Sequence, residues 1–300
     1  MHFMIGRWWK TLTEKLGLKS RSEPRSLNLD DADSKITANQ LGLCVASFGK
    51  VSICGNFREH NEDNLFTPDA SYTGLTPIYI VADGMGGQHG GEHASRIAVD
   101  VVPHEFARRF RDETKSRALT SALTEAIVMA NQEIIAFSKI QPQYSSMGTT
   151  LTAVSVNQGK AFVVGVGDSR CYRIRAGRVE QLTRDHSMAQ ALADVGTIRQ
   201  DEVASHRYNH VLYRYLGSRD LPSEMPEIKI FAMLEGDRFV ICSDGLSGVV
   251  SDKEMVNILK DESDAQLAAQ KLVDLAVENR SRDNITCIVL NIGRAENSSS

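Results

Sequence analysis

The sequence predicts one mixed α+β domain in which helix pairs cover antiparallel sheets. The first observation is that short apolar, strand-like segments follow one another with tight turns between them, which favours antiparallel pairing. The second is that long helical patterns occur as two consecutive pairs, and such helices bury their apolar sides against sheets. No solenoid-type repeat is present, and 300 residues suffice to bury a large core.

The first 40 residues differ in composition from the rest. Residues 1–18 place apolar side chains, among them Trp8 and Trp9, on one helical face beside basic residues. Residues 19–40 are polar and are typical of a linker. This N-terminal helix could dock on a membrane surface or a partner, pack on the main domain, or lack a fixed structure. We expect one compact domain over residues 41–295 and a frayed tail over residues 296–300.

Within this domain the elements are expected in a definite order. Strands are predicted at 44–53, 77–82, 149–156, 161–166, 171–174, 238–242 and 285–292, and helices at 92–110, 118–138, 252–260 and 264–278. Turn sequences at 157–159 and 175–177 separate neighbouring strands.

The composition is ordinary for a globular protein and excludes several classes. The net charge of −4 offers no basis for binding nucleic acid. No apolar segment approaches the roughly 20 residues that span a bilayer, and the N-terminus lacks the features of a secretory signal. The five cysteines are odd in number and widely spaced, which predicts buried, reduced thiols and a cytoplasmic location.

Acidic residues at strand ends are the most informative feature. Asp83, Asp168 and Asp244 each follow an apolar strand and precede a small residue. Asp63 and Asp283 instead precede a strand. In an antiparallel pair, the end of one strand lies beside the start of the other, so Asp83 can meet Asp63 and Asp244 can meet Asp283. We therefore expect five carboxylates to converge on one patch.

Such a cluster requires neutralisation, because carboxylates about 4 Å apart repel one another by several kcal/mol. Hard oxygen ligands without histidine or cysteine favour Mg²⁺ or Mn²⁺ over zinc. A single Asp-Gly pair is usually only a turn, but the set is distributed over the whole domain and directed at one edge. The glycine that follows Asp83 and Asp244 is expected to leave room for a metal-bound water or a liganding carbonyl.

Seven motifs along the chain resemble a known family. In order they are Arg58-Glu59-His60-Asn61-Glu62-Asp63-Asn64, Asp83-Gly84-Met85-Gly86-Gly87, Met147-Gly148-Thr149-Thr150, Gly167-Asp168-Ser169-Arg170, Leu182-Thr183-Arg184-Asp185-His186-Ser187, Ser243-Asp244-Gly245-Leu246 and Arg282-Asp283-Asn284-Ile285-Thr286. They resemble the ordered motifs of the type-2C (PPM) protein serine/threonine phosphatases, in the form of the bacterial branch. The resemblance covers about residues 44–293 and implies a four-layer α-β-β-α sandwich with metals at one edge.

The resemblance also implies roles for the acids. Asp83 would bridge two divalent cations, Mn²⁺ or Mg²⁺, and the carbonyl of Gly84 would bind one of them. Asp244 and Asp283 would complete the ligands of the second ion. Water shared by two such ions loses a proton near neutral pH and can attack phosphorus in line.

Further residues of the motifs would support this site. Asp63, with Glu62 beside it, would hold a metal directly or through water, and Asp168 would help to bind a third, weaker ion. Arg58 would bind the substrate phosphate, since a guanidinium fork suits a phosphate dianion. Residues 185–217 would form a flap beside the site.

The expected activity is hydrolysis of phosphoserine and phosphothreonine on proteins by a monomer that opposes a serine/threonine kinase. Met85 occupies the position at which some relatives carry a histidine proposed as general acid. His60, His89 and His93 are close in sequence, but none is assigned as an acid, and metal-bound water can serve. Bulky residues at 211–217 of the flap leave the substrate open.

Three alternative functions fit the sequence less well. An inactive pseudophosphatase that only binds partners would normally have lost at least one of the acids. A cysteine-based phosphatase needs an arginine six positions after its cysteine, and none of the five cysteines has one. A metal nuclease could share the carboxylates, but the chain has no basic stripe.

Overall fold

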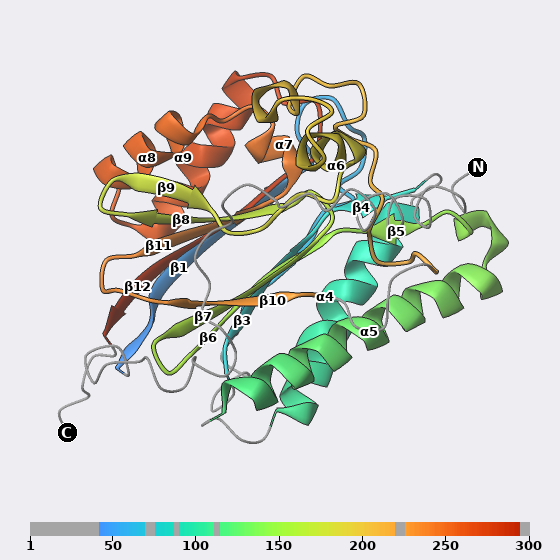
Figure 1. Cartoon of the computed structure of the whole chain (residues 1–300), viewed down its shortest axis with the longest axis horizontal. Coiled ribbons are helices and arrows are strands. Elements are labelled where there is room, and N and C mark those ends of the chain that lie inside the picture. The colour runs from blue at the N-terminus through green and yellow to red at the C-terminus, as the bar shows by residue number, and fades with distance from the viewer. Residues whose placement is uncertain (1–41, 70–75, 87–89, 111–114, 220–225, 295–300) are drawn as a thin grey trace.

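The computed structural model describes residues 42–69, 76–86, 90–110, 115–219 and 226–294. The predicted N-terminal segment, its linker, the C-terminal tail and His89 lie outside the described residues. Within them, two five-stranded antiparallel sheets pack face to face, and helices cover both outer faces (Figure 1).

Each sheet combines strands from separate parts of the chain. One sheet has the order β10-β7-β6-β3-β2 and consists of β2 (Asn64–Phe66), β3 (Ile78–Ala82), β6 (Leu151–Asn157), β7 (Lys160–Val166) and β10 (Ile228–Ala232). The other has the order β1-β12-β11-β8-β9 and consists of β1 (Leu43–Ile53), β8 (Arg170–Arg175), β9 (Arg178–Gln181), β11 (Arg238–Cys242) and β12 (Ile285–Arg294). Every pairing within these sheets is antiparallel.

Three hydrophobic cores separate four layers. The first lies between the β3-containing sheet and the helices α4 (Gly90–Arg109) and α5 (Ser116–Ile140). The second fills the space between the two sheets, where Val81, Val154, Phe239 and Ile288 are buried. The third lies under α8 (Asp252–Asp261) and α9 (Ala265–Glu278). The predicted α-β-β-α sandwich is therefore confirmed.

Local sequence explains several of the element boundaries. The β6–β7 hairpin turns at Gln158 and Gly159, both with positive φ, and Ala176 and Gly177 do the same between β8 and β9. Helix α8 begins with a capping box, in which the Ser251 hydroxyl accepts from the Glu254 N–H and the Glu254 carboxylate accepts from the Ser251 N–H.

Some elements differ from the prediction. The strand expected over 149–156 is divided at Thr150, because β5 (Gly148–Thr149) pairs with β4 (Gly84–Met85) instead of joining β6. The short strands β9 and β10, and the helices α6 (Met188–Asp194) and α7 (Asp244–Ser247), were not predicted. Two short 3₁₀ helices are formed by Pro142–Tyr144 and Gln200–Glu202.

Two general expectations can be compared with the described residues. All five cysteines are free, and Cys171, Cys242 and Cys287 are buried. Among the helices that the structure describes, none combines the length and the apolar character that a bilayer crossing requires.

Candidate functional site

Antiparallel pairing brings the strand-end acids to one end of the sandwich. Asn64 lies opposite Ala82 in the β2–β3 pair, so Asp63 and Asp83 follow at the same sheet edge. Cys242 lies opposite Cys287 in the β11–β12 pair, which places the segments that carry Asp244 and Asp283 side by side. Asp168 lies in the β7–β8 connection, where the chain crosses from one sheet to the other.

A cleft of about 830 Å³ opens at this end of the molecule. Seven of the eight residues singled out from the sequence line it: Arg58, Glu62, Asp83, Gly84, Asp168, Asp244 and Asp283. Asp63 is the exception, because it lies behind the cleft wall with only 5 % of its surface exposed.

Asp63 is held by hydroxyl groups from the opposite sheet. The Ser243 hydroxyl donates to Asp63 Oδ2 over 2.8 Å, and Thr286 provides a further side-chain hydrogen bond. Burial nevertheless raises the pKa of Asp63 to about 7, against the lowering effect of these hydrogen bonds. Asp63 therefore lies at the back of the acidic cluster in surroundings that disfavour its charged form.

Asp83 and Asp168 are also buried acids. The Asp83 backbone is fixed at both polar groups, since its N–H donates to Thr150 Oγ1 over 2.9 Å and its carbonyl accepts from the Thr150 N–H over 2.8 Å. Burial, together with the charges of Asp63 and Asp244, raises the pKa of Asp83 well above its usual range. Burial and the Asp244 charge raise the pKa of Asp168 to about 7.

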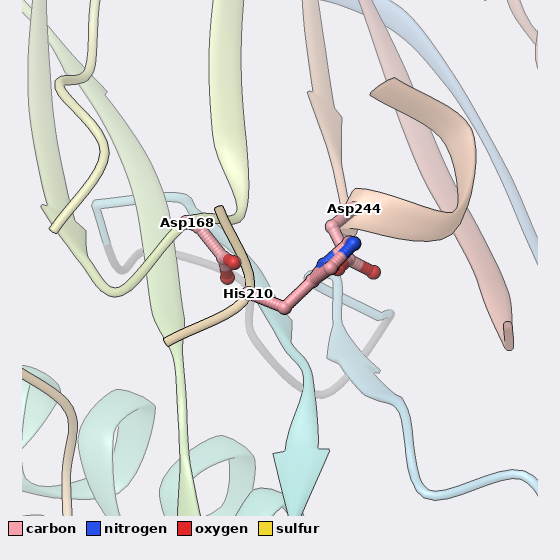
Figure 2. A group of neighbouring side chains, drawn as sticks. All are labelled: Asp168, His210 and Asp244. Carbon is pink, nitrogen blue, oxygen red and sulfur yellow. The ribbon is translucent and has the colours of Figure 1, made fainter. Parts of the chain in front are cut away.

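Asp244 lies beside a histidine that sequence reasoning missed. Figure 2 shows His210 reaching toward Asp244 with Asp168 nearby, and the ligand atoms of these three residues all lie within 4.8 Å of one another. His210 Nδ1 is 3.4 Å from Asp244 Oδ2, and this contact is the main cause that raises the pKa of His210. Asp244 Oδ1 is buried without a hydrogen-bond partner among the described residues. No local pattern marks His210, because it enters the site only through the path of the 185–217 segment.

Arg58 forms an ion pair with Asp283 in this structure. Its Nη2 lies 2.7 Å from Asp283 Oδ2, while the N–H of Asn284 donates to Asp283 Oδ1 over 2.8 Å. The Arg58 side chain remains half exposed at the cleft. The other histidines near the motifs do not line the cleft: the ring of His93 packs on Tyr144 at 4.7 Å between centroids, and His60 is exposed.

The glycines after Asp83 and Asp244 serve backbone packing. A Cβ on Gly84 would lie 2.5 Å from the Glu62 carbonyl oxygen and would overlap the backbone of Gly91. A Cβ on Gly245 would overlap the carbonyl oxygen of Asn284. A side chain at either position would therefore collide with a neighbouring chain segment, and glycine allows these segments to pack closely beside the acids.

Residues 185–217 cover one side of the cleft and are attached at both ends. At the start, Arg170 donates to both oxygens of Asp185 over 2.7–3.1 Å. At the end, Thr149 and Leu216 exchange two backbone hydrogen bonds of 2.9–3.0 Å. Between these anchors the segment contributes His210 and Leu212 to the cleft wall.

The donor set suits divalent cations. Four of the five predicted aspartates line the cleft together with Glu62 and Asp185, the fifth aspartate lies behind it, and one buried oxygen of Asp244 has no described partner. Burial, and after it the charges of neighbouring aspartates, raises the pKa values of Asp63, Asp83 and Asp168, so their ionised forms need compensation by cations. Oxygen ligands of this kind fit Mg²⁺ and Mn²⁺.

Comparison with known proteins agrees with this site. The family model described as protein phosphatase 2C matches residues 58–282. The serine/threonine protein phosphatase PstP of Mycobacterium tuberculosis is 32% identical over 248 residues, which is 83% of this chain and 45% of PstP. The serine/threonine phosphatase stp of Listeria monocytogenes is 32% identical over 240 residues, which is 79% of this chain and 92% of stp.

A solved structure shares the fold. The catalytic domain of serine threonine protein phosphatase PstP in complex with two manganese ions superposes with a TM-score of 0.69 at 29% identity, covering 84% of this chain and 98% of that one. The chain spans less than half the length of the mycobacterial relative and nearly all of the Listeria one. With the family model matching more than half of its residues, this chain belongs to the protein phosphatase 2C family.

Proposed function

We propose that this protein is a metal-dependent phosphatase that hydrolyses phosphoserine and phosphothreonine on other proteins. The observation that carries the proposal is the convergence of five carboxylates and Arg58 around one open cleft. The named activities of the mycobacterial and Listeria relatives support it. An open cleft also suits a phosphorylated side chain on the surface of a large substrate.

We assign Asp83, Asp244 and Asp283 as ligands of two divalent cations, with the Gly84 carbonyl as a further ligand. The two manganese ions in the PstP structure support Mn²⁺ as one suitable metal. When bound, the cations supply a nucleophile by lowering the pKa of water and offset negative charge on the phosphoryl oxygens. Asp63 and Glu62 would help to hold these cations. Asp63 would do so through water, because its carboxylate accepts a hydrogen bond from Ser243.

Arg58 would bind and orient the phosphoryl group. Its guanidinium is held at the cleft by Asp283 and is exposed enough to reach a ligand. When substrate and metal are bound, the Arg58 guanidinium would exchange its ion pair with Asp283 for a bidentate contact with the phosphate dianion, and Asp283 would bind a cation instead. This exchange would couple phosphate binding to a metal-loaded site.

A third cation site is proposed at Asp168, His210 and Asp244. The ligand atoms of this group are already within 4.8 Å of one another. Because His210 belongs to the 185–217 flap, an ion held there would fasten the flap to the body of the domain. The nitrogen ligand makes this site more suitable for Mn²⁺ than for Mg²⁺.

The natural substrates would be targets of a serine/threonine kinase, and the kinase itself could be among them. A monomer in the cytoplasm is the simplest state, with peripheral docking on a membrane or partner through residues 1–18 as a further expectation.

A phosphatase assay with purified full-length protein, a phosphothreonine peptide and Mn²⁺ tests the proposal. Turnover that EDTA abolishes and excess Mn²⁺ restores is the expected result. The Asp83→Asn variant, purified in parallel, controls for contaminating phosphatases. No turnover by the wild-type protein would instead favour the pseudophosphatase alternative, a folded domain that binds partners without hydrolysis.

A further inference from the structure

A second cavity lies at the base of the flap, and the segment that carries Asp185 and His186 separates it from the cleft. It has a volume of about 160 Å³ and lies between β7, the start of β10 and the two ends of the flap. The neighbouring residues Asp185 and His186 separate the two spaces, because Asp185 lines the cleft and His186 lines this cavity.

The ring of His186 has an unusual arrangement of hydrogen-bond partners. The backbone N–H of Gly167 points at Nδ1 over 3.1 Å, and Arg214 Nη1 lies 3.2 Å from Nε2. A backbone N–H can only donate, so Nδ1 carries the lone pair and the hydrogen of the neutral ring is on Nε2. Nε2–H and the Arg214 guanidinium are then two donors that face each other without an acceptor between them.

The ring cannot leave this position easily. His186 is buried, and its own backbone is held by Gly167 on one side and Tyr213 on the other. Burial and the nearby cations lower the pKa of His186 to about 3, which agrees with a neutral ring. Nε2–H thus lacks an acceptor in the wall of a polar cavity, and buried donors are normally satisfied.

The charges around the cavity favour an anion. Arg214, Lys229 and Arg184 all lower the pKa of His186 through their charges, and Glu227 is the one acidic side chain in the described lining. Arg184 is paired with Asp194, which lies outside the lining. Arg214 makes no ion pair with a carboxylate among the described residues; its other contact is with the ring of Tyr213, 5.7 Å away.

We propose that this cavity binds a small tetrahedral oxyanion, of the class of inorganic phosphate or sulfate, which lies beside His186 and Arg214 and accepts hydrogen bonds from His186 Nε2–H, Arg214 and Lys229. The anion would supply the acceptor that the two facing donors lack. His186 lies near the start of the flap and Arg214 near its end. The anion would therefore also connect both ends of the flap to Lys229 on the edge strand β10. This inference does not depend on the proposed activity, because it concerns binding at a separate cavity.

Long-range ¹H–¹⁵N spectra of the histidine rings test the proposal on the full chain in the presence of Mg²⁺, with the His186→Gln variant assigning the resonance. We expect the Nε2–H tautomer for His186 and a saturable change of its Nε2 shift when sodium phosphate or sodium sulfate is added, but not sodium chloride. Because the signal belongs to His186, phosphate binding at the metal site does not imitate it.

Two variants complete the experiment. Arg214→Gln should weaken the phosphate-dependent shift by about tenfold in affinity, since it removes a charge-assisted hydrogen bond. Arg207→Gln is the matched control, because this flap arginine stacks on Tyr208 outside the cavity and its loss should change nothing. If Arg214→Gln alters folding, Lys229→Gln at the edge of the sheet provides the second variant. An Nδ1–H tautomer, or an Nε2 shift that no oxyanion changes, would overturn the proposal, as would equal affinity in both arginine variants.

Discussion

The hydroxyl of Ser243 donates a 2.8 Å hydrogen bond to Asp63 Oδ2, although the two residues extend from different sheets of the sandwich. The same hydroxyl oxygen accepts from the N–H of Thr286 over 3.0 Å. This buried contact fixes Asp63 at the back of the carboxylate cluster and joins the two sheets next to the proposed metal site.

Replacing Ser243 should therefore weaken metal binding. In Ser243→Ala we expect the Mn²⁺ concentration for half-maximal activity to rise by about 10- to 100-fold, as is typical for residues that orient ligands. The free energy of unfolding should fall by about 1–3 kcal/mol, because Asp63 and the Thr286 N–H lose a buried partner. Mn²⁺ titrations of activity and urea unfolding measure these effects.

Ser155→Ala is the matched control for this variant. Its hydroxyl is equally buried and donates to the Pro77 carbonyl over 2.9 Å, away from the cleft. It should lower stability without altering the Mn²⁺ requirement. An unchanged Mn²⁺ requirement in Ser243→Ala would show that Asp63 has no role in metal binding.

Asp83→Asn and Asp244→Asn should each abolish turnover while the fold survives. The loss should be on the order of a thousandfold or more, since a catalytic metal contributes several kcal/mol to the transition state. The metal-free variants should melt no lower than the wild type, because each substitution removes charge from a mutually repulsive cluster. Asp274→Asn, at an exposed acid of α9, is the control, and full activity of both site variants would contradict the ligand assignment.

Arg58→Ala should chiefly raise KM for a phosphopeptide. The exposed guanidinium is positioned to bind the phosphoryl group, and a lost charge-assisted hydrogen bond corresponds to about a tenfold change or more. Steady-state kinetics at saturating Mn²⁺ separate the two parameters. A fall in kcat alone would indicate that Arg58 acts only in the transition state.

His210→Ala tests the proposed third cation site in the flap. We expect about a tenfold higher Mn²⁺ requirement for a second, weaker binding step, with the tighter step unchanged. Isothermal titration with Mn²⁺ resolves the two steps without relying on activity. His206→Ala, a flap histidine outside the cleft lining, should bind Mn²⁺ like the wild type; identical titrations of all three proteins would remove His210 from the site.

The metal-free protein should become less stable as the pH rises. The folded-state pKa values of Asp63 and Asp168 are raised to about 7, so these carboxyls bind protons more tightly in the folded than in the unfolded chain. The stabilisation is complete below the unfolded pKa of about 4 and is lost as the pH rises through about 7.

Urea unfolding in EDTA across this pH range measures the effect. The free energy of unfolding should fall toward alkaline pH, and added Mn²⁺ should stabilise the protein most at the alkaline end. Asp63→Asn should show a weaker pH dependence, because one titrating carboxyl is gone. A metal-free wild type whose stability rises with pH would refute the assignment of these raised pKa values.

Local sequence was sufficient for most elements of the fold. The predicted strand at 238–242 coincides with β11, and the turn at 157–159 forms the predicted hairpin. Strand β9, with Arg178 and Glu180 among its four residues, has too weak an apolar pattern to be recognised. Its pairing with β8 depends on the preceding turn and on the sheet already present.

The acids at strand ends, and the expectation that antiparallel pairs would bring them to one edge, follow from residue order alone because strand direction determines which ends meet. Only the tertiary structure shows that His210 lies beside Asp244, that Asp63 contacts Ser243 and that His186 contacts Arg214. Asp63 and Ser243 are separated by 180 positions, and His186 and Arg214 by 28. Such contacts are decided by how sheets and loops pack, and no local propensity encodes them.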